Sequence, residues 1–283
     1  MRNRTKLTLF RAERKNLPHA ENFSAAPLTP LVPDLPMPRA LFLSPHLDDV
    51  AFSCAATARH LLRGGWSVQL VTVFTASIND PQGFALACQL DKGLAPDVDY
   101  MALRRAEDAE FCRIVGIENY AHWPFQEAPH RGYDAAPALF AGVREGDEIW
   151  RDVLAKLQTI ETPDTVFAPQ GLGHHADHLQ VIRAVIERGW ASQTFWCRDT
   201  PYAIRQPNAE PSELLPPQTT SGFVAFDEAE LEVKIAGCCA YRSQIEFQFG
   251  GAHEVARKLK QFHRDEARDA GREGYAERFC VGV

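Results

Sequence analysis

The sequence predicts an α/β fold: a Rossmann-like, doubly wound and mostly parallel sheet flanked by helices, with an extended N-terminal arm. Short apolar runs of strand length recur along the chain, segments with helical periodicity separate them, and glycine or proline clusters mark the boundaries. We divide the chain into a proline-rich arm over residues 1–38 and a single domain over residues 39–283.

The first strand and helix carry the clearest signals. Residues 40–44 read Ala-Leu-Phe-Leu-Ser, which is typical of a buried strand. Residues 49–63 place alanine, cysteine and leucine on one helical face, and Gly64-Gly65 ends that helix. The apolar run 68–74 follows as a second strand, so this region predicts one right-handed βαβ unit.

The same alternation continues to the end of the chain. Residues 75–100 are expected to form a polar loop, and residues 104–115 a helix that Gly116 ends. Residues 147–160 carry isoleucine, valine and leucine on one helical stripe. A proline-rich stretch, 206–217, predicts an exposed loop. The other expected elements are strands at 120–125, 165–168, 194–197 and 223–226 and helices at 178–188, 227–242 and 253–268.

Composition and charge exclude several classes of protein. The net charge of −7 over 283 residues argues against a nucleic-acid partner, because phosphate binding needs clustered lysine and arginine. No apolar run approaches the roughly 18 residues of a membrane span. The basic residues 1–15 lack the apolar region of a signal peptide, and seven cysteines without paired spacing indicate a reducing compartment. We therefore expect a cytoplasmic protein with a small-molecule partner. The arm is expected to lie on the body or on a neighbouring subunit, which would make the protein a homo-oligomer; the alternative for residues 1–15 is a disordered tail.

Two short motifs carry the chemistry, and each follows a predicted strand. The first is Pro-His-Leu-Asp-Asp at residues 45–49, and the second is His-Ala-Asp-His at residues 175–178. Ligands of open α/β sheets bind at the carboxyl ends of the strands. We therefore expect the two motifs to meet around one divalent cation. A nucleotide-binding Rossmann site is disfavoured, because no G-x-G-x-x-G turn follows the first strand.

The first motif offers two ligands and a base. His46 and Asp49 lie three residues apart where a strand gives way to a helix, so both can face one point. A catalytic zinc takes three such protein ligands and leaves a fourth position for water. Asp48 then points beside the cation, toward that water, and is the candidate general base. The alternative is that Asp48 and Asp49 only cap the helix.

The second motif offers the third ligand and an acid. His178 is the candidate ligand, and His175 is the candidate cation that stabilises an oxyanion and protonates a leaving amine. Asp177 is expected to orient and charge the imidazole of His175. His174 could take the role of either histidine, and Asp177 could instead serve as a helix cap.

At these residues the chain resembles the PIG-L/LmbE-like zinc-dependent N-acetylglucosaminyl deacetylases. The family's first motif has the form Ser-Pro-His-x-Asp-Asp and its second the form His-x-Asp-His; here they read Ser-Pro-His-Leu-Asp-Asp at 44–49 and His-Ala-Asp-His at 175–178. Leu47 replaces the usual proline at a position that carries no ligand. The resemblance implies zinc on His46, Asp49 and His178, with Asp48 as base and His175 as acid or oxyanion stabiliser.

Weaker matches extend the resemblance. The helix around Arg104 is similar to the family's Arg-x-x-Glu helix, which implies that Arg104 holds substrate hydroxyls; the alternative is a solvated run of charges on a helix face. Glu127 stands near the position of a substrate-contacting aspartate of the family, a departure that leaves the identity of the substrate open. Residues 241–244 and 277–279 are similar to its C-terminal signature. The resemblance implies hydrolysis of the amide bond of an N-acetylated amino sugar or glycoconjugate. The alternatives are a metal-dependent amidase or esterase for a non-sugar molecule and a non-catalytic, metal-containing binding module.

Overall fold

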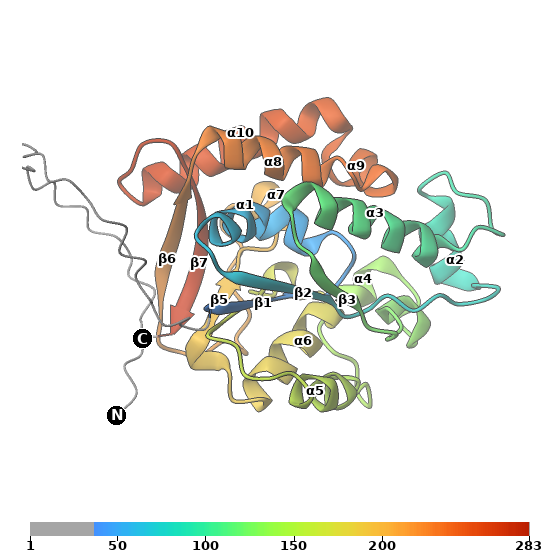
Figure 1. The fold of residues 1–283 in the computed structure, drawn as a ribbon. Helices are drawn as coiled ribbons and strands as arrows, with labels where there is room; N and C mark the ends of the chain where they lie inside the picture. The colour runs from blue at the N-terminus through green and yellow to red at the C-terminus, as the bar shows by residue number, and fades with distance from the viewer. Residues whose placement is uncertain (1–36, 283) are drawn as a thin grey trace, which may run out of the picture.

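The computed structural model describes residues 37–282, so the arm expected for residues 1–38 lies outside the described part except for its last two residues. Seven strands form one sheet in the order β3-β2-β1-β4-β5-β7-β6 (Figure 1). The strands are β1 (Arg39–Ser44), β2 (Ser67–Thr72), β3 (Asn119–His122), β4 (Thr165–Pro169), β5 (Thr194–Cys197), β6 (Thr219–Phe226) and β7 (Tyr275–Gly282). Neighbours among β1–β5 are parallel, and β7 runs antiparallel to β5 and β6. The predicted Rossmann-like, mostly parallel sheet is confirmed.

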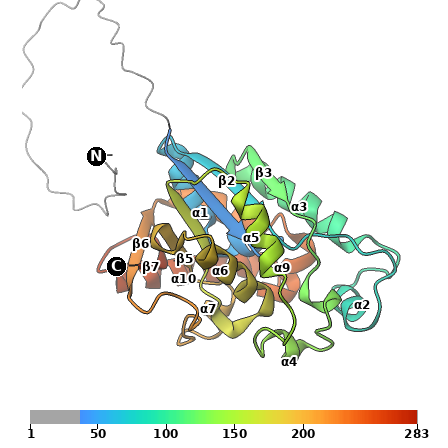
Figure 2. The same ribbon diagram turned by 90° about the horizontal axis from the view of Figure 1, so that it is seen from below.

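Helices cover both faces of the sheet. The longer ones are α1 (Asp49–Arg63), α2 (Gly83–Leu90), α3 (Tyr100–Val115), α5 (Trp150–Gln158), α6 (Ala176–Glu187), α8 (Glu228–Cys238), α9 (Arg242–Phe249) and α10 (Ala252–Asp269), with short turns α4 (Ala136–Leu139) and α7 (Tyr202–Arg205). Helices α1, α3, α8, α9 and α10 lie on one side, and α5 and α6 on the other (Figures 1 and 2). Within residues 37–282, no helix is long and apolar enough to cross a membrane.

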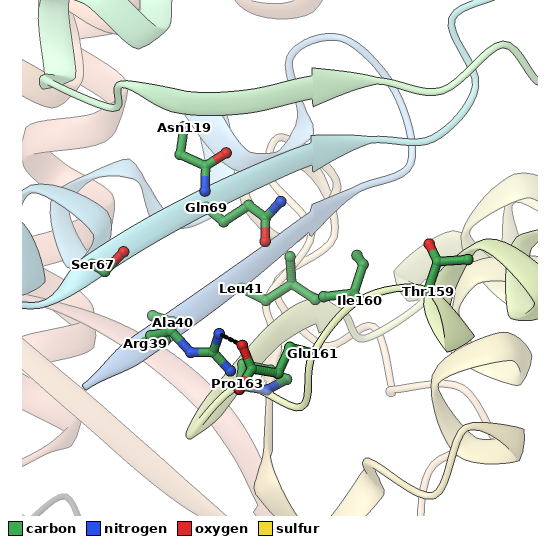
Figure 3. A pocket seen from close by; sticks show the side chains of 10 residues that line it. All are labelled: Arg39, Ala40, Leu41, Ser67, Gln69, Asn119, Thr159, Ile160, Glu161 and Pro163. Carbon is green, nitrogen blue, oxygen red and sulfur yellow. Dashed lines mark hydrogen bonds and ion pairs between the residues drawn. The ribbon is translucent and has the colours of Figure 1, made fainter. Parts of the chain in front are cut away.

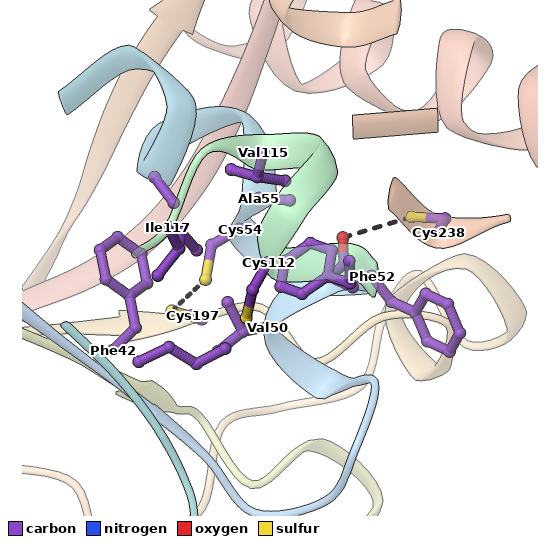
Figure 4. Close-up of a cluster of buried hydrophobic side chains, with 14 of the residues drawn as sticks. Phe42, Val50, Phe52, Cys54, Ala55, Cys112, Val115, Ile117, Cys197 and Cys238 are labelled. Carbon is purple, nitrogen blue, oxygen red and sulfur yellow. Dashed lines mark hydrogen bonds between the residues drawn. The ribbon is translucent and has the colours of Figure 1, made fainter. Parts of the chain in front are cut away.

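Alternate residues of β1 face two separate cores, because side chains of a strand point to opposite faces. Phe42 stacks on Phe167 of β4 at a centroid distance of 4.3 Å and packs under α1 and α3 (Figure 4). Leu41 and Leu43 pack with α5 and α6 on the other face. Both faces of β1 are therefore buried, which fixes the position of the motif that follows it.

Besides the short turns α4 and α7, three elements were not predicted from the sequence. Strand β7 carries Glu277 and Arg278 in its middle, and charged residues are depleted in strands. The Glu277 carboxylate is buried against Lys234 of α8, a partner that is remote in sequence. Helix α2 lies inside the segment 75–100 that was expected to be a loop, and α9 forms where no separate helix was expected.

A polar pocket of about 300 Å³ opens at the amino ends of the first three strands (Figure 3). Its lining includes Arg39, Ser67 and Asn119, which are the first residues of β1, β2 and β3. Because both sequence motifs follow the carboxyl ends of strands, this pocket lies at the opposite edge of the sheet and is not their site.

Candidate metal centre and active site

The structure brings the two motifs together. β1 and β4 are parallel neighbours, so the turns at their carboxyl ends meet. The rings of His46 and His178 are 5.3 Å apart, and those of His46 and His175 are 4.8 Å apart. His174, by contrast, is exposed and stands outside this histidine cluster.

Asp49 lies between two of these histidines. One oxygen, Oδ2, is 3.2 Å from Nδ1 of His46 and 3.3 Å from Nε2 of His178. Nε2 of His178 is buried and has no hydrogen-bond partner among residues 37–282. An orphaned imidazole nitrogen beside a carboxylate and a second imidazole is a donor set that suits a divalent cation such as zinc. These residues therefore fit the metal that the sequence predicts.

The other ring nitrogen of each histidine is held by a carboxylate. Nε2 of His46 donates to Oδ2 of Asp177 at 2.9 Å, and Nδ1 of His178 donates to Oδ1 of Asp199 at 2.6 Å. Carboxylates in this position fix the orientation and tautomer of metal-binding histidines. Although burial disfavours its charged form, Asp49 and Asp199 raise the pKa of His178 to about 9. The surroundings thus favour positive charge at this point, and metal binding would replace the proton.

The expectation that Asp177 orients His175 is wrong. The Asp177 carboxylate is fully buried, where it pairs with Arg131 at 2.8 Å and accepts the hydrogen bond from His46. His175 instead accepts a hydrogen bond at Nδ1 from the backbone N–H of Asp177 at 3.2 Å, so its neutral ring carries the proton on Nε2. Burial and the neighbouring His46 lower the pKa of His175 to about 3. His175 is thus a neutral hydrogen-bond donor in this structure, and its role as a cation during the reaction stays a prediction.

His175 also belongs to a second set of candidate ligands. One ligand atom each from His46, His175 and His178 lie within 4.8 Å of one another. In the alternative set of His46, Asp49 and His178, one oxygen of Asp49 lies within 3.3 Å of a ring nitrogen of each histidine. This set leaves His175 free to contact a substrate.

Asp48 does not cap helix α1. It occupies the position before the helix, but its side chain accepts no capping hydrogen bond, and its backbone has φ 147°. A non-glycine residue in this region is strained, at a cost of about 1–3 kcal/mol, and such strain clusters at active sites. The strained backbone argues against a purely structural role for Asp48.

Arg104 links Asp48 to Glu127. Its guanidinium is buried, donates to Glu127 at 2.7 Å and to the carbonyl of Leu47 at 3.0 Å, and lies 3.6 Å from Asp48. Burial raises the pKa of Asp48 to about 7, and Arg104 opposes that shift. Both expected substrate-binding residues therefore lie beside the candidate base, with Glu127 the more exposed of the two.

Sequence reasoning missed Asp199, Arg131 and two aromatic residues at this site. Asp199 comes two residues after β5, the same strand-end position that singled out the two motifs, and could have been found that way. The ring of Phe140 is 5.3 Å from that of His175, and Tyr202 packs on Phe140 at 5.9 Å. No pattern in the sequence marks these two rings as neighbours of the histidines.

The fold and the site together define a Rossmann-like α/β protein with a candidate histidine–aspartate metal site at the carboxyl ends of β1 and β4. Residues 41–188 match the family described as PIG-L, GlcNAc-PI de-N-acetylase, and the chain belongs to this family. The resemblance seen in the sequence is confirmed. A 2'-N-acetylparomamine deacetylase from Streptomyces fradiae is 32% identical over 220 residues, which are 74% of this chain and 74% of that protein.

Solved structures agree on the fold. The zinc-inhibited form of the teicoplanin deacetylase Orf2 has a TM-score of 0.70 at 22% identity, covering 86% of this chain and 97% of the other. The A40926 pseudoaglycone deacetylase Dbv21 has a TM-score of 0.69 at 27% identity, covering 86% and 96%. GalB, a 4-carboxy-2-hydroxymuconate hydratase from Pseudomonas putida, has a TM-score of 0.52 at 17% identity, covering 87% and 97%. Since the fold also serves a hydratase, the reaction must be argued from the site.

Proposed function

We propose that this protein is a zinc-dependent N-deacetylase that removes the acetyl group from an N-acetylated amino sugar of a small molecule or glycoconjugate. One observation carries the proposal: His46, Asp49 and the orphaned Nε2 of His178 converge beside Asp48. The relative that deacetylates 2'-N-acetylparomamine supports the amino sugar. We also propose one domain over residues 39–283 and a cytoplasmic location, which the seven free cysteines support.

The residues suggest a division of labour in amide hydrolysis. A divalent cation held by His46, Asp49 and His178 would polarise the acetyl carbonyl and lower the pKa of the attacking water. Asp48 accepts a proton from that water while the oxygen of the water bonds to the acetyl carbon. His175 donates its Nε2–H to the carbonyl oxygen as negative charge develops there. The C–N bond then breaks, Asp48 returns the proton to the leaving amine, and acetate departs.

The proposal is tested by measuring acetate release from purified protein before and after chelation, and after zinc, cobalt or manganese is added back. The panel holds 2'-N-acetylparomamine, N-acetylglucosamine and non-sugar acetamides and esters. We expect release from an acetylated amino sugar that chelator abolishes and zinc restores. Turnover confined to non-sugar compounds would contradict the substrate class, and the absence of turnover from zinc-loaded protein would favour a binding module.

Phe140 is the proposed platform for the sugar ring. Its side chain is 40% exposed although it touches His175, so an apolar ring face is open beside the reacting groups. Packing on an aromatic ring contributes about 1 kcal/mol, so Phe140→Ala is expected to raise KM by roughly fivefold to tenfold with little change in kcat. Steady-state kinetics on the best amino sugar measure this.

Val143 provides a matched control for Phe140. It is also 40% exposed and lies three residues along the same segment. Val143→Ala should leave KM unchanged, and Phe140→Trp should restore it. An equal KM for Phe140→Ala and the parent protein would remove Phe140 from the substrate site.

A further inference from the structure

Helix α1 is interrupted one turn after the candidate ligand Asp49. Cys54 adopts φ −143° and ψ 25° inside a segment that is otherwise helical from Asp49 to Arg63. A break of this kind disrupts the regular hydrogen-bond ladder, so backbone groups on either side of it need other partners. The first turn, which carries Asp49 and directly follows Asp48, can therefore take a direction of its own.

One buried ion pair bridges this break. Nζ of Lys234, on α8, donates to the carbonyl of Ser53 at 3.1 Å and to Glu277, on β7, at 2.7 Å. Glu277 in turn accepts from the backbone N–H of Ala56 at 3.2 Å and of Thr57 at 2.8 Å. The Lys234 ammonium thus contacts the carbonyl that ends the first turn. The Glu277 carboxylate contacts the amides that begin the rest of the helix.

This polarity matches the partial charges of helix ends, since carbonyl ends favour cations and amide ends favour anions. Lys234 is 0% exposed and Glu277 is 2% exposed. Burial of two charges carries a large desolvation cost, and a well-packed apolar pair is often as stable. A contribution to fold stability alone therefore does not explain why these two charges are buried here. A role in fixing the break in α1 does explain it.

Two further contacts tie the first turn to its surroundings. Cys238, four residues after Lys234 on α8, lies with its sulfur 3.3 Å from the carbonyl of Ala51 (Figure 4). The hydroxyl of Ser53 accepts a hydrogen bond from the backbone N–H of Thr200 at 3.1 Å. Thr200 directly follows Asp199, the residue that holds His178. A shift of the first turn would thus reach two of the three candidate ligands.

We propose that Lys234 and Glu277 are positioning residues for the metal centre. They fix the angle of the first turn of α1, and through it the placement of Asp49 and the support of His178 by Asp199. This inference rests on the proposed metal site, because the pair acts only through residues of that site.

The test is metal affinity in a variant that removes both charges, Lys234→Met/Glu277→Leu. Zinc dissociation constants and the absorption spectrum of the cobalt-loaded protein report the ligand geometry without using activity. We expect about tenfold weaker zinc binding and an altered cobalt spectrum. Tenfold is the lower end of the effect on metal affinity of residues that orient ligands. Leu259→Ala, a buried truncation on α10, is the control for lost stability alone and should keep the parent affinity and spectrum.

A double variant that folds and binds zinc within twofold of the parent overturns the inference. If it does not fold, Thr57→Val replaces it. This substitution keeps the side-chain volume and removes the hydroxyl that donates to Glu277 at 2.5 Å. Weaker zinc binding by Thr57→Val supports the inference, and unchanged binding overturns it. Failure of the parent protein itself to bind zinc or cobalt would instead contradict the proposed function.

Discussion

Asp48→Asn is expected to lower kcat by about 10²–10⁴-fold while the protein keeps the proposed zinc, because the substitution removes the proposed general base and leaves the three candidate ligands in place. Asparagine is the informative replacement. It has nearly the same shape as the aspartate that adopts φ 147° here. Metal content and steady-state kinetics on the same preparation separate the two effects.

Asp80 offers a matched control for this substitution. It is the other aspartate with positive φ among residues 37–282, at 54°, and it lies in an exposed loop. Asp80→Asn should leave kcat and metal content unchanged. If Asp48→Asn retains kcat within a few-fold of the parent, another group takes the proton; if it loses zinc, Asp48 contributes to the ligand set.

The fold and the meeting of the two motifs could be predicted because both depend on local pattern. The apolar runs at 40–44 and 165–168 predict buried parallel strands, and parallel strands place their carboxyl ends at one edge of a sheet. That the turns are in contact then requires β1 and β4 to be neighbours, which the structure shows. Because His46 and Asp49 are three residues apart in the turn after β1, both candidate ligands could also be predicted to face the same point.

The partners of the motif residues could not be predicted, because they come from distant segments. Asp177 lies two residues from His175, and proximity in sequence suggested that they pair. Its position in the first turn of α6 turns the carboxylate toward His46 and Arg131 instead. Strand β7 was missed for a related reason, since the partner that neutralises its buried Glu277 is 43 residues away. Local pattern carries no record of such contacts.

Loss of the His178 imidazole is expected to abolish function. His178→Ala should remove zinc from the purified protein and lower deacetylation by at least about 10³-fold, since a bound metal contributes several kcal/mol to the transition state. The imidazole is fully buried, so no side chain from the surface can take its place without rearrangement. Metal analysis, a thermal unfolding curve and acetate release measured together distinguish loss of metal from loss of fold.

Asp199→Asn should give a smaller effect of the same kind, about 10–100-fold in metal affinity, because Asp199 holds the His178 ring and is not itself one of the proposed ligands. Its carboxylate accepts from both His178 and the backbone N–H of Leu172, and a single amide oxygen cannot replace both acceptors. Metal affinity that falls from the parent protein to Asp199→Asn, and falls further in His178→Ala, is the signature of a metal centre with a supporting carboxylate. If His178→Ala still binds one zinc per chain, the ligand set must instead draw on His175, and the division of roles between the two histidines is reversed.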